Sequence, residues 1–192
     1  MMSYSEELGL DLAIPEDRFK WFLASMLFAK RISAEIAKRT YSRFEEEGLS
    51  SPKRIIDVGW ERLVQVLDSG GYVRYDFSTA SNLLEAMEKL ENEYGGLERL
   101  HEWSKDGKDL EKRLKEFKGI GPVGVNIFLR ELRGIWDKAD PAPSKMAVKI
   151  AQKINFRDVK CHESALVRIN LEHCKTGECD GCPVKKYCKN LK

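Results

Sequence analysis

Four cysteines near the C-terminus have a spacing that predicts metal chemistry. Cys174, Cys179, Cys182 and Cys188 form a C-x4-C-x2-C-x5-C pattern. Four thiolates can bind a [4Fe–4S] cluster or one tetrahedral zinc ion. Structural zinc sites usually use two short cysteine pairs, whereas this segment has one short pair between two single cysteines. We therefore predict an iron–sulfur cluster, with zinc or no metal as the alternatives. The fifth cysteine, Cys161, is predicted to be an ordinary buried thiol.

A glycine-containing stretch upstream could bind an anion. An apolar helical pattern over residues 110–117 breaks at Gly119-Ile120-Gly121 and restarts at Pro122, which suits the first turn of a helix. This pattern predicts helix, tight hairpin, helix. The start of the second helix presents free N–H groups that attract phosphate, and Lys118 adds positive charge beside it. The alternative is a helical corner that only packs.

The composition determines which elements can position these residues. The 192 residues are 42% hydrophobic and 33% charged, as in a soluble protein with a core, and the net charge is +2. An anionic partner must therefore meet a local basic patch. The sequence contains no apolar run long enough to cross a membrane, and the acidic N-terminus has no signal-peptide core. We expect a cytoplasmic or nucleoid-associated protein, monomeric, without a membrane partner.

Helical periodicity dominates the whole chain, and no segment alternates for long enough to predict a strand. Residues 1–14 are expected to be weakly structured. Serines at 33, 51, 78 and 144 are predicted to cap helices. The expected helices cover 15–29, 33–48, 52–59, 60–67, 78–94, 97–103, 110–117, 122–132, 146–154 and 161–174. About ten short helices predict an all-α fold.

The hairpin, the Pro-rich turn at 137–143, the helix after it and the cysteine loop together resemble the endonuclease III branch of the helix-hairpin-helix DNA glycosylases. The resemblance covers the chain from about Phe19 to Cys188, although the family's cysteine loop is C-x6-C-x2-C-x5-C, with a first interval two residues longer. It implies a two-lobed helical fold. Residues 30–133 would form a six-helix barrel lobe with the hairpin. Residues 1–29 plus 134–192 would form a second lobe with the cluster, and double-stranded DNA would bind between the lobes.

The resemblance also implies which residues face DNA. The hairpin would hold a phosphate, one loop would fill the gap left by an extruded base, and the cysteine loop would contact phosphate. Alternatively, Tyr72 covers the core, and the lysines of the cysteine loop are solvated surface residues. The residues concerned are Lys118, Gly119, Gly121, Val123, Lys30, Arg31, Tyr72, Lys185 and Lys186.

Catalytic candidates follow from the same resemblance. Val123 stands where the family's bifunctional members have a Schiff-base lysine, so no family-type β-lyase activity is expected. The family's catalytic aspartate aligns with Ser144, which cannot carry its charge. Asp140 is the candidate carboxylate, with a turn aspartate as the alternative. Lys145 is a weaker candidate, as an amine nucleophile or as a phosphate contact.

The resemblance, with these residues, implies a monofunctional DNA N-glycosylase of base-excision repair. Such an enzyme extrudes a damaged nucleotide and cleaves the bond between base and sugar. A cationic alkylated purine, which leaves easily, is the substrate class that the sequence favours. One alternative is a catalytically inactive relative that binds damaged or distorted DNA. Another is a helical domain unrelated to DNA.

Overall fold

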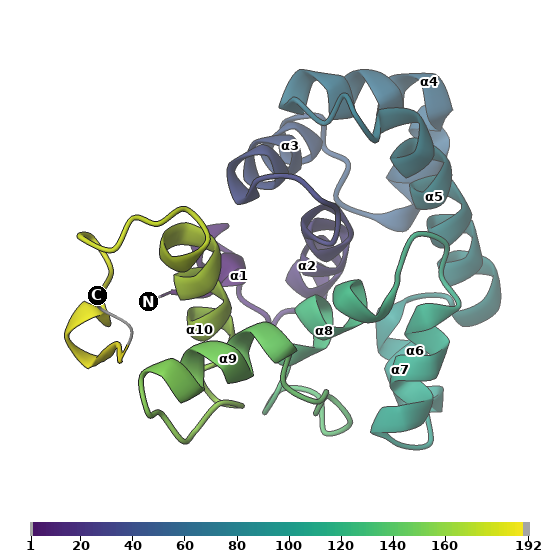
Figure 1. Cartoon of the computed structure of the whole chain (residues 1–192). Coiled ribbons are helices and arrows are strands. Elements are labelled where there is room, and N and C mark those ends of the chain that lie inside the picture. The colour runs from purple at the N-terminus through teal and green to yellow at the C-terminus, as the bar shows by residue number, and fades with distance from the viewer. Residues whose placement is uncertain (1, 190–192) are drawn as a thin grey trace.

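The computed structural model describes residues 2–189 and is built from helices. Ten α-helices and three short helical turns account for its regular structure, and residues 2–189 contain no strand. The prediction of an all-α fold is confirmed. Figure 1 shows the helices around a central α2, with the yellow C-terminal segment at one edge. Their bounds are α1 Tyr4–Glu7, α2 Pro15–Phe28, α3 Ala34–Glu46, α4 Pro52–Gly70, α5 Asp76–Lys89, η1 Leu90–Tyr94, α6 Leu97–Trp103, α7 Gly107–Lys115, α8 Pro122–Arg130, α9 Lys145–Lys153, α10 Glu163–Ile169, η2 Asn170–Cys174 and η3 Lys185–Tyr187.

Three of the four predicted serine caps form. Ser33, Ser51 and Ser144 each accept a hydrogen bond from a backbone N–H in the first turn of the following helix. Ser78 does not, because α5 already begins at Asp76 and the Ser78 hydroxyl donates to the carbonyl of Tyr75. The helices predicted at 52–59 and 60–67 join into α4, with Gly59 at a positive φ of 77° as the kink between them.

The N-terminal segment is more ordered than predicted. Ser3 and Glu6 form a reciprocal capping box that starts α1. Leu10 and Leu12 are buried against the large core. Burial of these two leucines fixes a segment whose local pattern alone is too short to predict a helix.

Two hydrophobic cores organise the chain. The larger draws on residues between Tyr4 and Ala139, and the smaller on residues between Ala147 and Ile169. Helix α2 lies inside the large core, where Trp21 is fully buried and the helix packs against α3 and α8 (Figure 1). The buried apolar residues of segment 4–29 therefore belong to the large core, while Tyr4 and Glu7 also contact Arg168 near the C-terminal core. The apolar residues surround nearly the whole of α2, which suits a central helix.

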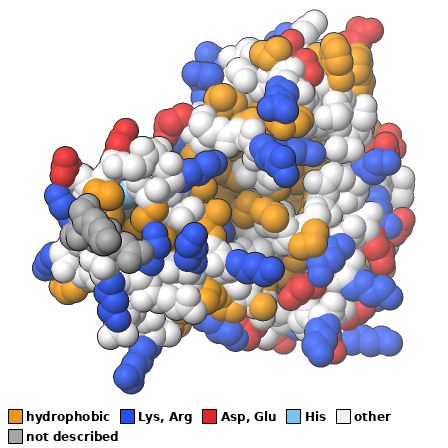
Figure 2. Space-filling view, viewed as in Figure 1, with side chains coloured by type: hydrophobic (Ala, Val, Ile, Leu, Met, Phe, Trp, Pro, Cys, Tyr) orange, Lys and Arg blue, Asp and Glu red, His pale blue; other side chains and the backbone are white. Residues whose placement is uncertain are grey.

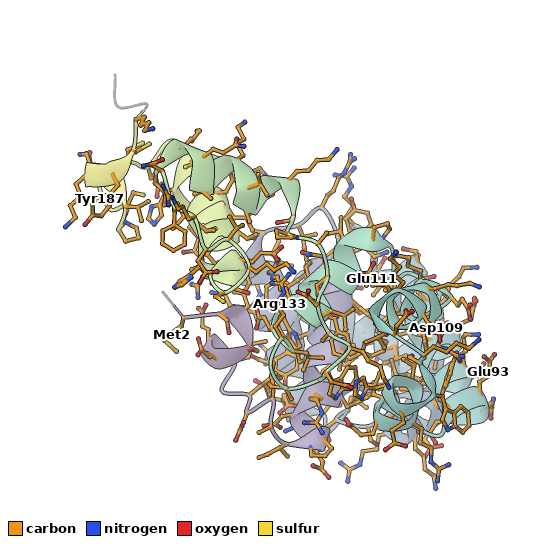
Figure 3. All side chains as sticks on the ribbon, turned by 90° about the horizontal axis from the view of Figure 1, so that it is seen from below. Met2, Glu93, Asp109, Glu111, Arg133 and Tyr187 are labelled. Carbon is orange, nitrogen blue, oxygen red and sulfur yellow. The ribbon has the colours of Figure 1, made fainter. Side chains whose placement is uncertain are left out.

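The C-terminal core consists of α9 and α10, and Val184 of the cysteine segment packs against it. Seen from below in Figure 3, Arg133 lies where these helices meet the rest of the molecule, while Tyr187 lies at the far end. None of the helices in the described part of the chain is long and apolar enough to cross a membrane.

Candidate functional site

The glycine turn between α7 and α8 is built as the sequence predicts. Gly119 has a φ of +80°, and a Cβ added there would lie 2.9 Å from the Cβ of Asn82. Both features require glycine. Gly121 is the N-cap of α8 and offers no side-chain cap, and Val123 in the first turn is 62% exposed. The first N–H groups of α8 therefore start at an open surface.

A pocket of about 610 Å³ opens beside this helix start and separates the two cores. It runs along one face of α8, between the end of α2 and the start of α9. Figure 2 shows hydrophobic side chains in a hollow of this face, bordered by Lys and Arg side chains. Its walls are formed by Tyr4, Phe28, Ala29, Lys30, Pro122, Val123, Asn126, Ile127, Arg130, Ala142, Pro143, Ser144, Lys145, Met146, Val167 and Leu171.

The pocket brings together residues that are far apart in the sequence. Lys30, Val123 and Lys145, each predicted separately, all line it, and so does Ser144. Its wall contains three cationic side chains and no aspartate or glutamate. The charge of the pocket is therefore positive, and it suits a ligand with negative charge or with hydrogen-bond acceptors.

Asp140 lies outside this lining. Its carboxylate accepts a 2.6 Å hydrogen bond from Lys160 Nζ, and Arg133 Nε lies 3.5 Å from its other oxygen. The hydrogen bond from Lys160 and the two nearby positive charges hold the pKa of Asp140 below its ordinary value. The structure therefore shows an ionised, paired turn aspartate.

Arg130 is the most buried of the three cations that line the pocket, and it also lines a separate hollow with Glu131 and Arg133. Its side chain is 7% exposed, Nε has no hydrogen-bond partner, and no ion pair to the guanidinium occurs within residues 2–189. The two nearest acidic residues are engaged elsewhere. Glu163 binds Arg133, and Glu131 accepts from the backbone N–H of Ser5. Burial lowers the pKa of Arg130 from its ordinary value.

Glu163 was not predicted from the sequence, yet it fixes the shape of the pocket. It is 1% exposed and accepts hydrogen bonds from Ser144 N (2.8 Å), Asn126 Nδ2 (3.0 Å) and Arg133 (2.8 Å). It thus ties α8, the start of α9 and α10 together. An acidic residue in the first turn of a helix normally caps that helix and stays exposed, so its position gives no sign of this role.

The other predicted DNA-facing residues fall into two groups. Lys30, half-buried, and Arg31, exposed, line a second hollow with Lys175. Lys118 is exposed, with its Nζ 3.7 Å from Glu85. Lys30, Arg31 and Lys118 therefore all reach the surface.

Tyr72 needs correction as a DNA contact. The side chain is 1% exposed, and its hydroxyl donates a 2.8 Å hydrogen bond to the carbonyl of Leu27. Burial raises its pKa well above the ordinary value. Tyr72 is therefore a core residue, held against α2 by its hydrogen bond to Leu27.

The loop lysines differ from each other. Lys185 Nζ is 2.7 Å from Asp180, which reduces the charge it can offer to a phosphate. Lys186 is exposed and lies over the Tyr187 ring, 4.9 Å from its centroid. Among residues 2–189, Lys186 has no ion pair, whereas Lys185 has one.

The four C-terminal cysteines line one small cavity of about 110 Å³, together with apolar side chains that include Ile150 and Ile154. Burial raises the pKa of the Cys174 thiol, Lys153 opposes this, and the other three thiols add to the rise. Within residues 2–189, no three His, Cys, Asp or Glu side chains converge closely enough to form a metal site.

The four thiols nevertheless share one cavity, and their chemistry is that of a metal ligand set. All four sulfur-bearing side chains face one cavity with an apolar wall, and mutual repulsion of thiolates favours a cation among them. Cys161 lies apart. It is exposed, which corrects the predicted buried thiol, and Asp158 raises its pKa by accepting its hydrogen bond.

Comparison with known proteins finds no protein-family model that matches this chain and no matching curated protein.

Proposed function

We propose that the protein is a DNA N-glycosylase of the helix-hairpin-helix class, which binds damaged duplex DNA and takes one nucleotide into the pocket beside α8. The observation that supports this is the convergence of Lys30, Val123 and Lys145 on one pocket. They come from three separate segments. An extruded nucleotide needs a pocket next to the backbone contacts that hold its strand, and here the two adjoin.

Backbone binding rests on the open start of α8 and on nearby lysines. Gly121 leaves the first N–H groups of α8 uncovered, and the positive end of the helix favours a phosphate. Lys118 and Lys145 supply charge on either side of it. Such contacts position a duplex without reading its sequence.

The pocket charge bears on the substrate. Three cations and no carboxylate oppose a cationic alkylated purine, which the sequence favours as substrate. The three cations suit a base that leaves with negative charge. We therefore propose hydrolysis assisted by leaving-group stabilisation, with no β-lyase step, since Val123 supplies no amine.

The second candidate is a DNA-binding relative that excises nothing. One observation favours it: no carboxylate lines the pocket, and Asp140 is paired with Lys160 and Arg133 outside it. A hydrolase that relies on a carboxylate to stabilise the sugar cation would lack that group in this pocket. The cysteine segment has the same role in both candidates, holding a [4Fe–4S] cluster, or zinc, as a structural element.

A lesion panel separates the candidates. Purified protein is incubated with end-labelled duplexes that each carry one altered base, and abasic sites are then cleaved with alkali. We expect strand cleavage for at least one lesion only after alkali treatment. Binding without cleavage across the panel would favour the second candidate, and no salt-sensitive binding at all would refute both.

Three variants assign the roles. Lys145→Gln should weaken binding to every duplex and lower the slope of log affinity against log salt by about one. Lys149→Gln, one turn further along α9 and outside the pocket lining, is the matched control. Asp140→Asn should retain excision, because its carboxylate does not line the pocket. Borohydride trapping of the wild type on abasic DNA that is lost in Lys145→Gln would instead assign amine chemistry to Lys145.

A further inference from the structure

Arg130 is a largely buried arginine whose Nε has no hydrogen-bond partner among residues 2–189, which is costly for the folded protein. Side-chain burial of a charge without hydrogen bonds is unfavourable unless a ligand or a partner compensates it. Most buried polar groups are satisfied within the protein, so an exception calls for an explanation. The adjacent carboxylates of Glu131 and Glu163 act on Arg130 by charge, but neither accepts a hydrogen bond from it, because other groups occupy their oxygens.

Its position within the pocket indicates what could compensate it. The pocket face of α8 runs from Pro122 to Arg130, a distance of about 12 Å at the rise of an α-helix. Val123 and Lys145 lie at the end where α8 and α9 begin, and Arg130 lies at the other end with Tyr4. A nucleotide held by its phosphate at the helix starts would therefore direct its base toward Arg130.

The walls between these ends suit a base. Phe28, Ile127, Met146 and Leu171 are apolar, and the Tyr4 ring stacks on Phe28 with centroids 4.7 Å apart. Apolar and aromatic walls bind the faces of a base whatever its edge. Discrimination between bases must then come from the polar group at the end of the pocket.

We propose that Arg130 recognises the edge of an extruded base that presents carbonyl oxygens, so that the pocket selects deaminated bases. The proposal rests on the proposed function. A guanidinium has five N–H donors and no acceptor, so it binds carbonyl oxygens and repels amino groups. Deamination replaces an amino group by a carbonyl: uracil replaces cytosine, and hypoxanthine replaces adenine. A mispaired deaminated base is also easier to extrude than a paired one.

The same contact assists excision. The bond between C1′ and the base nitrogen breaks, and its electron pair moves into the base, where the carbonyl oxygen takes up negative charge. Arg130 donates hydrogen bonds to that oxygen and stabilises the leaving anion. Water adds to C1′ of the sugar cation and releases a proton, and the departed base takes up one proton. The products are an abasic sugar and a neutral base.

Binding is tested with duplexes that carry a 2′-fluoro sugar at the target nucleotide, which slows excision. The duplexes contain a U·G pair, a hypoxanthine·T pair, an A·C mismatch or only matched pairs. The A·C mismatch controls for weak pairing, because both of its bases carry amino groups. We expect U·G and hypoxanthine·T to bind about five- to 150-fold more tightly than A·C, the range for one bidentate contact.

Variants of Arg130 then assign the contact. Arg130→Met should remove the preference and reduce excision of uracil and hypoxanthine by about 100- to 1000-fold. Its melting temperature should equal or exceed that of the wild type, because an apolar side chain replaces an unpaired charge. Arg130→Lys, which keeps the charge but loses the planar pair of donors, should retain part of the preference.

Each outcome is decisive. Equal affinity of the wild type for the deaminated pairs and for A·C overturns the proposal without any variant, even if Arg130→Met does not fold. An unchanged preference in a folded Arg130→Met protein also overturns it. Absence of binding to every duplex refutes the proposed function instead, and the recognition of deaminated bases with it.

Discussion

Replacement of Glu163 by alanine tests how the pocket is held. The side chain is 1% exposed, and its pair with Arg133, whose side chain is 14% exposed, spans 2.8 Å. Without Glu163, Arg133 would keep only the more distant carboxylate of Asp140, 3.5 Å away, and the carbonyls of Lys160 and Pro141. Removing one partner of a buried pair costs about 3–5 kcal/mol. For a domain of this size, such a loss lowers the melting temperature by roughly 6–20 °C.

The loss has a local component as well. Without the carboxylate, the backbone N–H of Ser144 and the amide of Asn126 lose their acceptor, so the start of α9 is released from α8. We expect the folded fraction of Glu163→Ala to bind damaged duplexes more weakly than the wild type, because Ser144 and Lys145 line the pocket.

The assay is chemical and thermal unfolding followed by circular dichroism, together with a double-mutant cycle. Arg133→Met alone and Glu163→Ala with Arg133→Met complete the cycle. The double variant should be less destabilised than the sum of the single variants, because it leaves no unpaired charge. A loss below about 1 kcal/mol in Glu163→Ala, or additive losses in the cycle, would refute the role given to this carboxylate.

Three further predictions concern the hairpin, Asp140 and the cysteines. Gly119→Ala should lower the free energy of unfolding by about 1–2 kcal/mol because of the positive φ, and further because the new Cβ would press on Asn82. Gly121→Ala should cost less, since its Cβ meets no atom and its φ is −99°. Similar unfolding free energies for the two variants would contradict this. The depressed pKa of Asp140 means that its pairing stabilises the fold above the pKa of the unfolded chain, and that the contribution is lost as pH falls through the folded pKa. Because this carboxylate is 60% exposed, Asp140→Asn should remove less than about 1 kcal/mol at neutral pH and nothing in strong acid, as measured by unfolding at both pH values. Cys182→Ala should abolish bound iron or zinc, measured by metal analysis and visible absorption, while Cys161→Ala keeps it; metal loss in both variants would contradict the four-cysteine set.

Local patterns in the sequence predict much of the fold. The apolar period and the glycines place most helices, and three serine caps form where expected. Residues 1–14 and the α5 start are exceptions, because tertiary burial of Leu10 and Leu12, and of Asp76, outweighs weak local signals. The all-helical class follows from the periodicity, whereas the division into cores does not.

The pocket was predictable only in part. Lys30, Val123 and Lys145 are named by their positions in the sequence, yet nothing in the sequence shows that they line one pocket. The prediction that Tyr72 contacts DNA is wrong because an aromatic residue in a polar loop can point to solvent or into the core. Arg130 and Glu163 escape prediction altogether, because burial of a charged residue depends on distant segments that pack over it.

The buried charges of α8 and α10 connect stability with recognition. Arg133 has a partner in Glu163, so that pair can serve the architecture alone. Arg130, three residues earlier on α8 and lining the pocket, has no ion pair or hydrogen bond from its side chain to any residue between 2 and 189. If its role were structural, a partner such as Glu131 would be expected to turn toward it, but that carboxylate binds Ser5 N and the Ser164 hydroxyl instead. The arrangement leaves Arg130 Nε buried without an acceptor among residues 2–189, and its other N–H groups without a protein partner there. A ligand with acceptor atoms is the group that would complete it.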